Sequence, residues 1–185
     1  MKIRKQTLEK ICNCISSRLV IPGGGAASAI CGALAAGLVA KVAAFSIDRR
    51  NEQPNEIRLK EIRQKAKELV VVFQELAEED CLAYESFSKD KKAKKRIKKV
   101  VEIPLEIARN AVEILELASF LVDQGNQRLI SDSRCAFELG TAAFYGALEI
   151  IKINLPLLDK GCKFESETRE EIDRLLDRVK NLFKA

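Results

Sequence analysis

Apolar residues recur every three or four positions along most of the chain, which is the spacing of helices with one buried face. Residues 7–19, for example, place five apolar side chains on one side of a helix: Leu8, Ile11, Cys12, Ile15 and Leu19. No stretch alternates between apolar and polar residues for long enough to predict a strand. We therefore expect an all-α fold, a multihelical bundle of about six helices that forms a single domain over residues 1–185.

The segment from Ala26 to Ala40 has no polar face, because Ser28 is its only polar residue. A helix that is apolar on every side is normally surrounded by other helices. The uncharged stretch covers 15 residues, whereas a membrane span requires roughly 20. We therefore expect a buried, Ala/Gly-rich central helix and no membrane partner.

Residues 55–88 carry the clearest helical signal, a heptad-type seam with steps of three and four. Its members are Leu59, Ile62, Ala66, Leu69, Phe73, Leu76, Asp80, Ala83 and Phe87. Asp80 stands where the pattern requires an apolar side chain, and burial of an unpaired carboxylate is costly. Two interpretations stay open. Asp80 is either a structural carboxylate, paired or solvated, or an acid/base whose pKa burial raises.

Three further helices are predicted, over residues 97–122, 131–155 and 166–183. Pro104 either starts or kinks the first of them. Gly125 and Asn126, which tolerate positive φ, would end it, and Ser131 and Asp132 would cap the next. These four residues either join two helices and do no more, or they bring the polar groups of two helix ends together around a ligand.

The charges are unevenly placed, since residues 89–99 hold seven Lys and one Arg. This run is either a solvated surface or a region that attracts a polyanionic substrate tail. Over the whole chain, 32 basic residues against 27 acidic ones give a net charge of +5. So small an excess does not indicate a nucleic-acid partner.

The chain of 185 residues contains no His, which excludes Ser-His-Asp and Cys-His nucleophiles and zinc sites with imidazole ligands. Any proton transfer must therefore use Asp, Glu, Lys, Tyr, Cys or water.

Six cysteines are present: Cys12, Cys14, Cys31, Cys81, Cys135 and Cys162. They form no C-x-x-C motif, and residues 1–10 lack the apolar core of a signal peptide. We expect reduced, mostly buried cysteines in a cytoplasmic protein.

A loop of Pro22, Gly23, Gly24 and Gly25 leads directly into the central helix. Unpaired N–H groups at a helix N-terminus attract anions, and glycines let a ligand approach them. The loop is therefore either a carboxylate- or phosphate-binding site or a tight turn that leads the chain into a crowded core.

Several segments, in order along residues 7–179, resemble one known family. They are Pro22-Gly-Gly-Gly-Ala-Ala-Ser-Ala, Asp80 with Ala83-Tyr84, Ile103-Pro-Leu-Glu-Ile-Ala, Gly125-Asn126, Ser131-Asp132, and Ile153-Asn154-Leu155 with Asp159. The chain is similar in these segments to the formimidoyltetrahydrofolate cyclodeaminases and methenyltetrahydrofolate cyclohydrolases. The resemblance implies a helical homodimer that acts on a folate, with or without a polyglutamate tail, and that uses no metal or redox cofactor.

The resemblance also implies roles for individual residues. Asp80 falls on the family's proposed proton donor and acceptor. The folate pocket would be lined by Gly23, Gly24, Gly25, Asn126, Ser131, Asp132 and Asn154. The reaction would be either cyclodeamination of formimino-tetrahydrofolate with release of ammonia or hydrolysis of methenyl- to formyl-tetrahydrofolate.

The alternative is a non-catalytic folate-binding or interaction module with the same fold. It is favoured by Ile21 and Ala26, which stand where the family usually has Thr and Ser, and by the Lys-rich run, which replaces a longer segment.

Overall fold

The computed structural model describes residues 2–47 and 55–184. Its α-helices are α1 (Leu8–Ile15), α2 (Gly24–Ser46), α3 (Glu56–Lys89), α4 (Lys94–Gln124), α5 (Ile130–Asn154) and α6 (Lys163–Leu182). Short 3₁₀ helices cover Ile3–Lys5, Gln127–Leu129 and Leu155–Leu157, and no strand occurs in these two ranges. The structure thus confirms the prediction of an all-α fold with about six helices.

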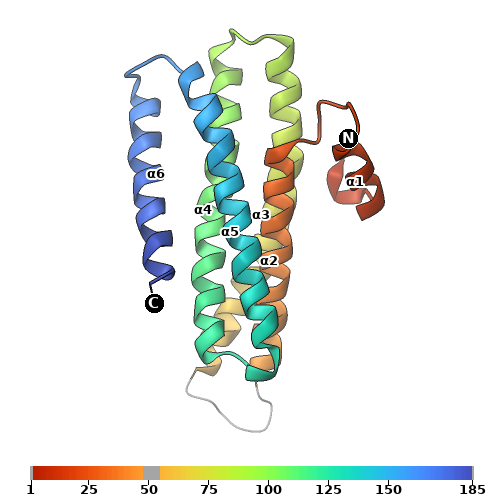
Figure 1. Cartoon of the computed structure of the whole chain (residues 1–185), viewed down its shortest axis with the longest axis vertical. Coiled ribbons are helices and arrows are strands. Elements are labelled where there is room, and N and C mark those ends of the chain that lie inside the picture. Colours follow the sequence, from red (N-terminus) through yellow and green to blue (C-terminus); the bar gives the residue numbers. More distant parts are fainter. Residues whose placement is uncertain (1, 48–54, 185) are drawn as a thin grey trace.

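Four long helices, α2 to α5, run up and down side by side, as Figure 1 shows. Helix α6 lies along α4, and the short α1 stands apart beside α2. Because the direction alternates, the starts of α2 and α4 and the ends of α3 and α5 meet at one end of the bundle. We call this the upper end, after its place in Figure 1. The opposite end, where α2 and α4 finish and α5 starts, is the lower end.

Helix α2 is the central helix, in contact with α3, α4 and α5. By length and composition alone it could cross a membrane, with a mean hydropathy of 1.8 in its most apolar window. Its place among three other helices explains the apolar composition. Small residues permit this arrangement, since an added Cβ at Gly32 would lie 2.4 Å from the ring of Phe73. The prediction of a buried Ala/Gly-rich central helix is confirmed.

Helix α3 follows its predicted seam only in part. The seam residues from Leu59 to Leu76 and the last one, Phe87, are buried, whereas Asp80 and Ala83 are half-buried and Ala77 and Cys81 are buried beside them. A straight α-helix drifts about 20° per heptad against a strict heptad repeat, so the buried face shifts toward Ala77 and Cys81 in the turns around Asp80. Asp80 is consequently half-buried, at the margin of the core.

Some predicted helix boundaries were wrong. Leu129, and not Ser131 or Asp132, is the N-cap of α5, and it makes no side-chain capping bond. The helix is preceded by a 3₁₀ turn that Asn126 caps, because its side chain accepts a hydrogen bond from the N–H of Arg128 (3.0 Å). Asp132 instead forms an ion pair with Lys41 (2.6 Å).

Other corrections concern single residues. Pro104 lies inside α4 and does not start it. Gly125 ends α4 with φ −83°, so no left-handed conformation is used there. Helix α2 begins at Gly24, two residues earlier than predicted, so Gly24 and Gly25 form its first turn.

The cysteines also differ from expectation. All six are free thiols, but only Cys14 and Cys81 are buried, while Cys12 and Cys135 are exposed. Cys12 of α1 and Cys135 of α5 lie on outward faces of their helices, so the prediction of mostly buried cysteines was wrong.

The close approach of α2 to α3 predicts opposite effects at two glycines of one helix. Gly32→Ala should lower the free energy of unfolding by about 1–3 kcal/mol, because the new methyl group overlaps Phe73. Gly37→Ala should raise it by about 0.5–1 kcal/mol, because no atom lies within 4 Å of the new methyl group and Ala favours helix. Urea denaturation measures both, and equal shifts would contradict the packing described here.

Candidate functional site

The carboxylate of Asp80 lies directly against the first turn of α2. A Cβ added to Gly25 would be 2.1 Å from Oδ1 of Asp80 and 2.7 Å from Oδ2, so the carboxylate occupies the space that a side chain at 25 would need. The backbone N–H of Ala26 is hydrogen-bonded to the same carboxylate. Glycine at 25 is therefore a requirement for this contact between α3 and α2.

The surroundings of Asp80 form a cavity of about 290 Å³ at the upper end. Its walls come from the segment before α2, from α2, from α3 and from the end of α5. The lining residues are Val20, Ile21, Gly23, Gly24, Gly25, Asp80, Tyr84, Ile150, Ile153 and Asn154. Asp80 is the only charged side chain among them. The cavity therefore combines one charged group with exposed backbone and largely apolar walls, an arrangement common in ligand pockets.

This environment shifts the acidity of Asp80. Burial raises the pKa of its carboxyl group to about 6, against an ordinary value of 3.8. The hydrogen bond from Ala26 acts in the opposite direction but is the smaller effect. A carboxyl group with a pKa near 6 is well suited to both accept and donate a proton close to neutral pH. The interpretation of Asp80 as an acid/base agrees with its geometry.

Asn154, at the end of α5, lines the same cavity and is buried. Its Nδ2 donates a hydrogen bond to the carbonyl oxygen of Val100 in α4 (2.8 Å). This bond fixes the end of α5 against α4. The cavity thus unites Asp80 with four of the seven residues predicted to bind substrate, namely Gly23, Gly24, Gly25 and Asn154.

The other three predicted residues lie at the lower end of the bundle. Asn126 donates from its backbone N–H to Oγ of Ser46 (2.8 Å) and from Nδ2 to the carbonyl of Phe45 (3.0 Å). Ser131 is exposed, and Asp132 is paired with Lys41. Because α2 separates the two ends with 23 residues at 1.5 Å each, they lie on the order of 30 Å apart within one chain.

A second cavity, of about 440 Å³, is present at the lower end. Its lining residues are Phe45, Ser46, Ile47, Gln124, Gly125, Asn126 and Arg128. Asn126 belongs to this cavity, but Ser131 and Asp132 do not. Within one chain, the residues predicted to form a single site therefore lie at opposite ends of the bundle.

Tyr84 and the apolar residues Val20, Ile150 and Ile153 were missed as site residues. Tyr84 follows Asp80 by four positions, which places both on one side of α3, so helical spacing alone could have identified it. No comparable signal identifies Ile150 and Ile153. They reach the cavity only through the packing of α5 on α2.

Ala26 bears on the family comparison, because a hydroxyl residue is usual there. Its side chain is fully buried, and only its backbone N–H reaches Asp80. Every residue except proline supplies this N–H, so Ala26 removes no group that faces the cavity. Among residues 2–47 and 55–184, no cluster of three His, Cys, Asp or Glu side chains is arranged to hold a metal ion.

The raised pKa of Asp80 predicts a pH-dependent effect of Asp80→Asn on stability. The folded state binds the proton more tightly than the unfolded chain, so ionised Asp80 destabilises the fold above pH 6 and has no effect below about pH 4. At pH 8 the variant should be more stable by about 1–2 kcal/mol, since solvent reaches the carboxylate and reduces the full effect.

Urea denaturation between pH 4 and pH 8 measures this difference, which should grow from zero as the pH rises. Glu79→Gln, at an exposed neighbouring position, is the matched control and should show no such growth. Loss of folding in Asp80→Asn at every pH would instead make Asp80 a structural carboxylate.

Comparisons with known proteins identify chains that are similar over most of the sequence. Residues 7–174 match the family described as formiminotransferase-cyclodeaminase. A methenyltetrahydrofolate cyclohydrolase of Methylorubrum extorquens is 26% identical over 92% of this chain and 89% of its own length. The formimidoyltransferase-cyclodeaminase of Gallus gallus is 27% identical over 90% of this chain, which spans only 33% of that protein.

The crystal structure of a formiminotetrahydrofolate cyclodeaminase from Thermotoga maritima has the same fold. The TM-score is 0.92 at 24% identity, over 98% of this chain and 94% of the other. Together with the match of the family over residues 7–174, this agreement leads to one conclusion. The chain belongs to the formiminotransferase-cyclodeaminase family.

Proposed function

We propose that this protein is a cytoplasmic enzyme of folate one-carbon metabolism, with Asp80 as its general acid/base. The observation that carries the proposal is the Asp80 carboxyl group, with a pKa of about 6, facing an otherwise uncharged cavity. The named activities of the cyclohydrolase and cyclodeaminase relatives support the substrate class. Free thiols at all six cysteines agree with a reducing compartment.

In cyclodeamination, the neighbouring folate nitrogen attacks the formimino carbon, and the bond from that carbon to the amino nitrogen breaks. One proton must leave the attacking nitrogen, and one must reach the departing nitrogen so that it leaves as ammonia. Asp80 can perform both transfers in turn, because its carboxyl group gains and loses a proton near neutral pH. The substrate supplies its own nucleophile, so we propose that no metal or cofactor takes part.

In the hydrolytic reaction, water adds to the methenyl carbon and Asp80 takes one of its protons. One carbon–nitrogen bond of the bridge then breaks, Asp80 returns the proton to the nitrogen that is released, and the remaining hydroxyl proton is lost to water as the formyl carbonyl forms. Both reactions thus use the same carboxyl group. The walls formed by Tyr84, Ile150 and Ile153 suit a flat heterocycle, because aromatic and aliphatic side chains pack against its faces.

A non-catalytic folate-binding module is the second candidate function. Ile21 favours it, because this apolar side chain lines the cavity at a position where the family usually has a hydroxyl group. A module of this kind would bind a methenyl- or formimino-folate and leave it unchanged.

Turnover decides between the two candidates. The loss of near-ultraviolet absorbance of methenyl-tetrahydrofolate measures hydrolysis, and its appearance from formimino-tetrahydrofolate measures cyclodeamination. Asp80→Asn should reduce kcat by about 10²–10⁴-fold, while Glu79→Gln should leave it unchanged. With Asp80 as the base, kcat/KM should rise with pH to a plateau above about 6. Binding of either folate without turnover would establish the module instead.

We also propose that the protein is a homodimer in which each copy contributes to both sites. Exposed apolar side chains on α2 and α5 support an interface there, among them Leu34, Phe45 and Ile153. The divided site supports an antiparallel arrangement, because a two-fold axis perpendicular to the long helices would bring the lower end of one copy to the upper end of the other. Asn126 of one copy would then face Asp80 of its partner.

Mixed dimers test this arrangement. Asp80→Asn and Asn126→Ala should each be inactive alone, whereas co-expression should restore about a quarter of the wild-type activity, because half the dimers are mixed and each has one intact site. Light scattering after size-exclusion chromatography gives the mass, and circular dichroism controls for folding of Asn126→Ala. A monomer, or no restoration in folded mixtures, would contradict the proposal.

We also propose that the folate substrate carries a polyglutamate tail. The support is the positive charge of residues 89–99, which end α3 and begin α4 at the upper end, where Asp80 also lies.

A further inference from the structure

The Asp80 cavity contains a second group that can form a hydrogen bond with a reactant, the hydroxyl group of Tyr84. Of the ten lining residues, only Asp80, Tyr84 and Asn154 have polar side chains. The amide nitrogen of Asn154 already has a partner, since it donates to the carbonyl oxygen of Val100 (2.8 Å). Within residues 2–47 and 55–184, the hydroxyl group of Tyr84 makes no hydrogen bond to a side chain or to the backbone. It is therefore available to a molecule in the cavity.

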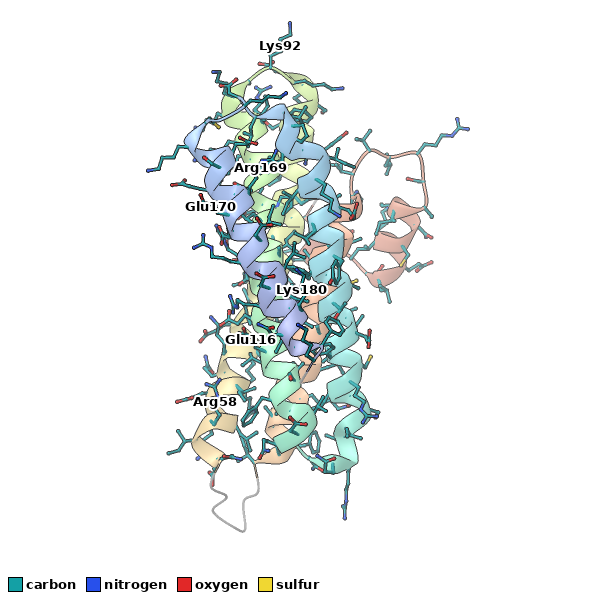
Figure 2. All side chains as sticks on the ribbon, turned by 60° about the vertical axis from the view of Figure 1, so that its left-hand side comes forward. Arg58, Lys92, Glu116, Arg169, Glu170 and Lys180 are labelled. Carbon is teal, nitrogen blue, oxygen red and sulfur yellow. The ribbon has the colours of Figure 1, made fainter. Side chains whose placement is uncertain are left out.

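Helix α3 makes Tyr84 and Asp80 neighbours. They are four residues apart, so they lie on one side of the helix with their Cβ atoms roughly 5–6 Å apart. Helix α3 runs toward the turn that carries Lys92 at its tip (Figure 2), so Tyr84 lies one turn nearer to this tip than Asp80. Long side chains on a helix lean toward its N-terminus. This tendency directs the ring of Tyr84 back toward Asp80, and both side chains line the same cavity.

Packing restrains the ring of Tyr84 but leaves the side chain accessible. The ring lies edge-on to that of Phe87, with the ring centroids 6.1 Å apart and an interplanar angle of 60°. Phe87 itself is buried in a small cluster with Ile97 and Val100 of α4. Tyr84, by contrast, is 40% exposed. A side chain that is already restrained loses little conformational freedom when it binds a small reactant.

Both reactions described above exchange one small molecule at a single carbon atom. Ammonia leaves this carbon in cyclodeamination, and water joins it in hydrolysis. For the bond to form or break, a lone pair of the nitrogen or oxygen must point at the carbon, so the hydrogen atoms must point elsewhere. Asp80 binds only the hydrogen that it transfers. A second acceptor beside it would fix the orientation of the small molecule, which is a large contribution to catalysis when geometry is limiting.

We propose that Tyr84 is a second catalytic residue, whose hydroxyl oxygen accepts a hydrogen bond from the attacking water or the departing ammonia. The inference rests on the function proposed above. In hydrolysis, one hydrogen of the water points at Asp80 and the other at Tyr84, so a lone pair of the oxygen faces the methenyl carbon. In cyclodeamination, the same two groups hold the nitrogen as it leaves with the proton that Asp80 supplies. Tyr84 itself neither gains nor loses a proton.

Substitution of each tyrosine in turn tests the proposal, because the chain contains only two. Tyr84→Phe should lower kcat by about 10–100-fold, the effect of one hydrogen bond lost in the transition state, and leave KM for the folate unchanged. Tyr145→Phe is the matched control. Tyr145 is 42% exposed and also lies edge-on to a phenylalanine, Phe144, but it does not line the cavity. This control should leave kcat and KM unchanged, and urea denaturation should show equal stability for the two variants.

The pH profile separates a direct role of Tyr84 from an effect on Asp80. In Tyr84→Phe, kcat/KM should still rise with pH to a plateau above about 6, because Asp80 keeps its surroundings and Tyr84 transfers no proton. A profile displaced by one pH unit or more would show that Tyr84 acts through Asp80, which would overturn the direct role. Unchanged kcat in Tyr84→Phe beside an active wild-type protein would also overturn it and leave the proposed function standing. A wild-type protein without turnover would overturn both.

Discussion

The contact between the Asp80 carboxylate and the first turn of α2 is the interaction on which the site depends. It joins two long helices at a point where α2 has no side chain, because Gly25 lacks a Cβ and leaves its space to the side chain of Asp80. The helix N-terminus offers N–H groups to an anion, whereas the surrounding apolar residues disfavour one. The second influence is the stronger, so the carboxyl group has a pKa near 6 and not below 4. The same contact thus determines both the position of the Asp80 carboxylate and its raised pKa.

The same principle of close backbone approach extends along α2. Gly32 admits the ring of Phe73, and Gly146 of α5 leaves room for the hydroxyl group of Ser28, whose oxygen would lie 2.3 Å from an added Cβ. These contacts bring α3 and α5 near enough to α2 for a shallow cavity to form at their ends. Helix α2 is apolar enough to resemble a membrane helix. Its apolar side chains are required for this packing.

Much of this could be predicted from the sequence. The helical periodicity indicated the six helices, and the carboxylate within a heptad seam identified Asp80. Side-chain capping was less predictable, because Asn126 begins a 3₁₀ turn that makes capping by Ser131 and Asp132 unnecessary. The division of the candidate site between two ends could not be predicted either. The order of motifs along a sequence does not show how far apart their residues lie in space until the directions of the helices are known.

Helix α2 is continuous from Gly24 to Ser46. The number of residues in this helix therefore determines how far apart the two ends of the bundle lie and how they are rotated relative to each other. Insertion of one residue within it would turn one end by about 100° relative to the other and shift it by about 1.5 Å. We therefore expect insertions to be tolerated only at places where no such count matters. The short turn between α3 and α4, with its lysines, is one of them.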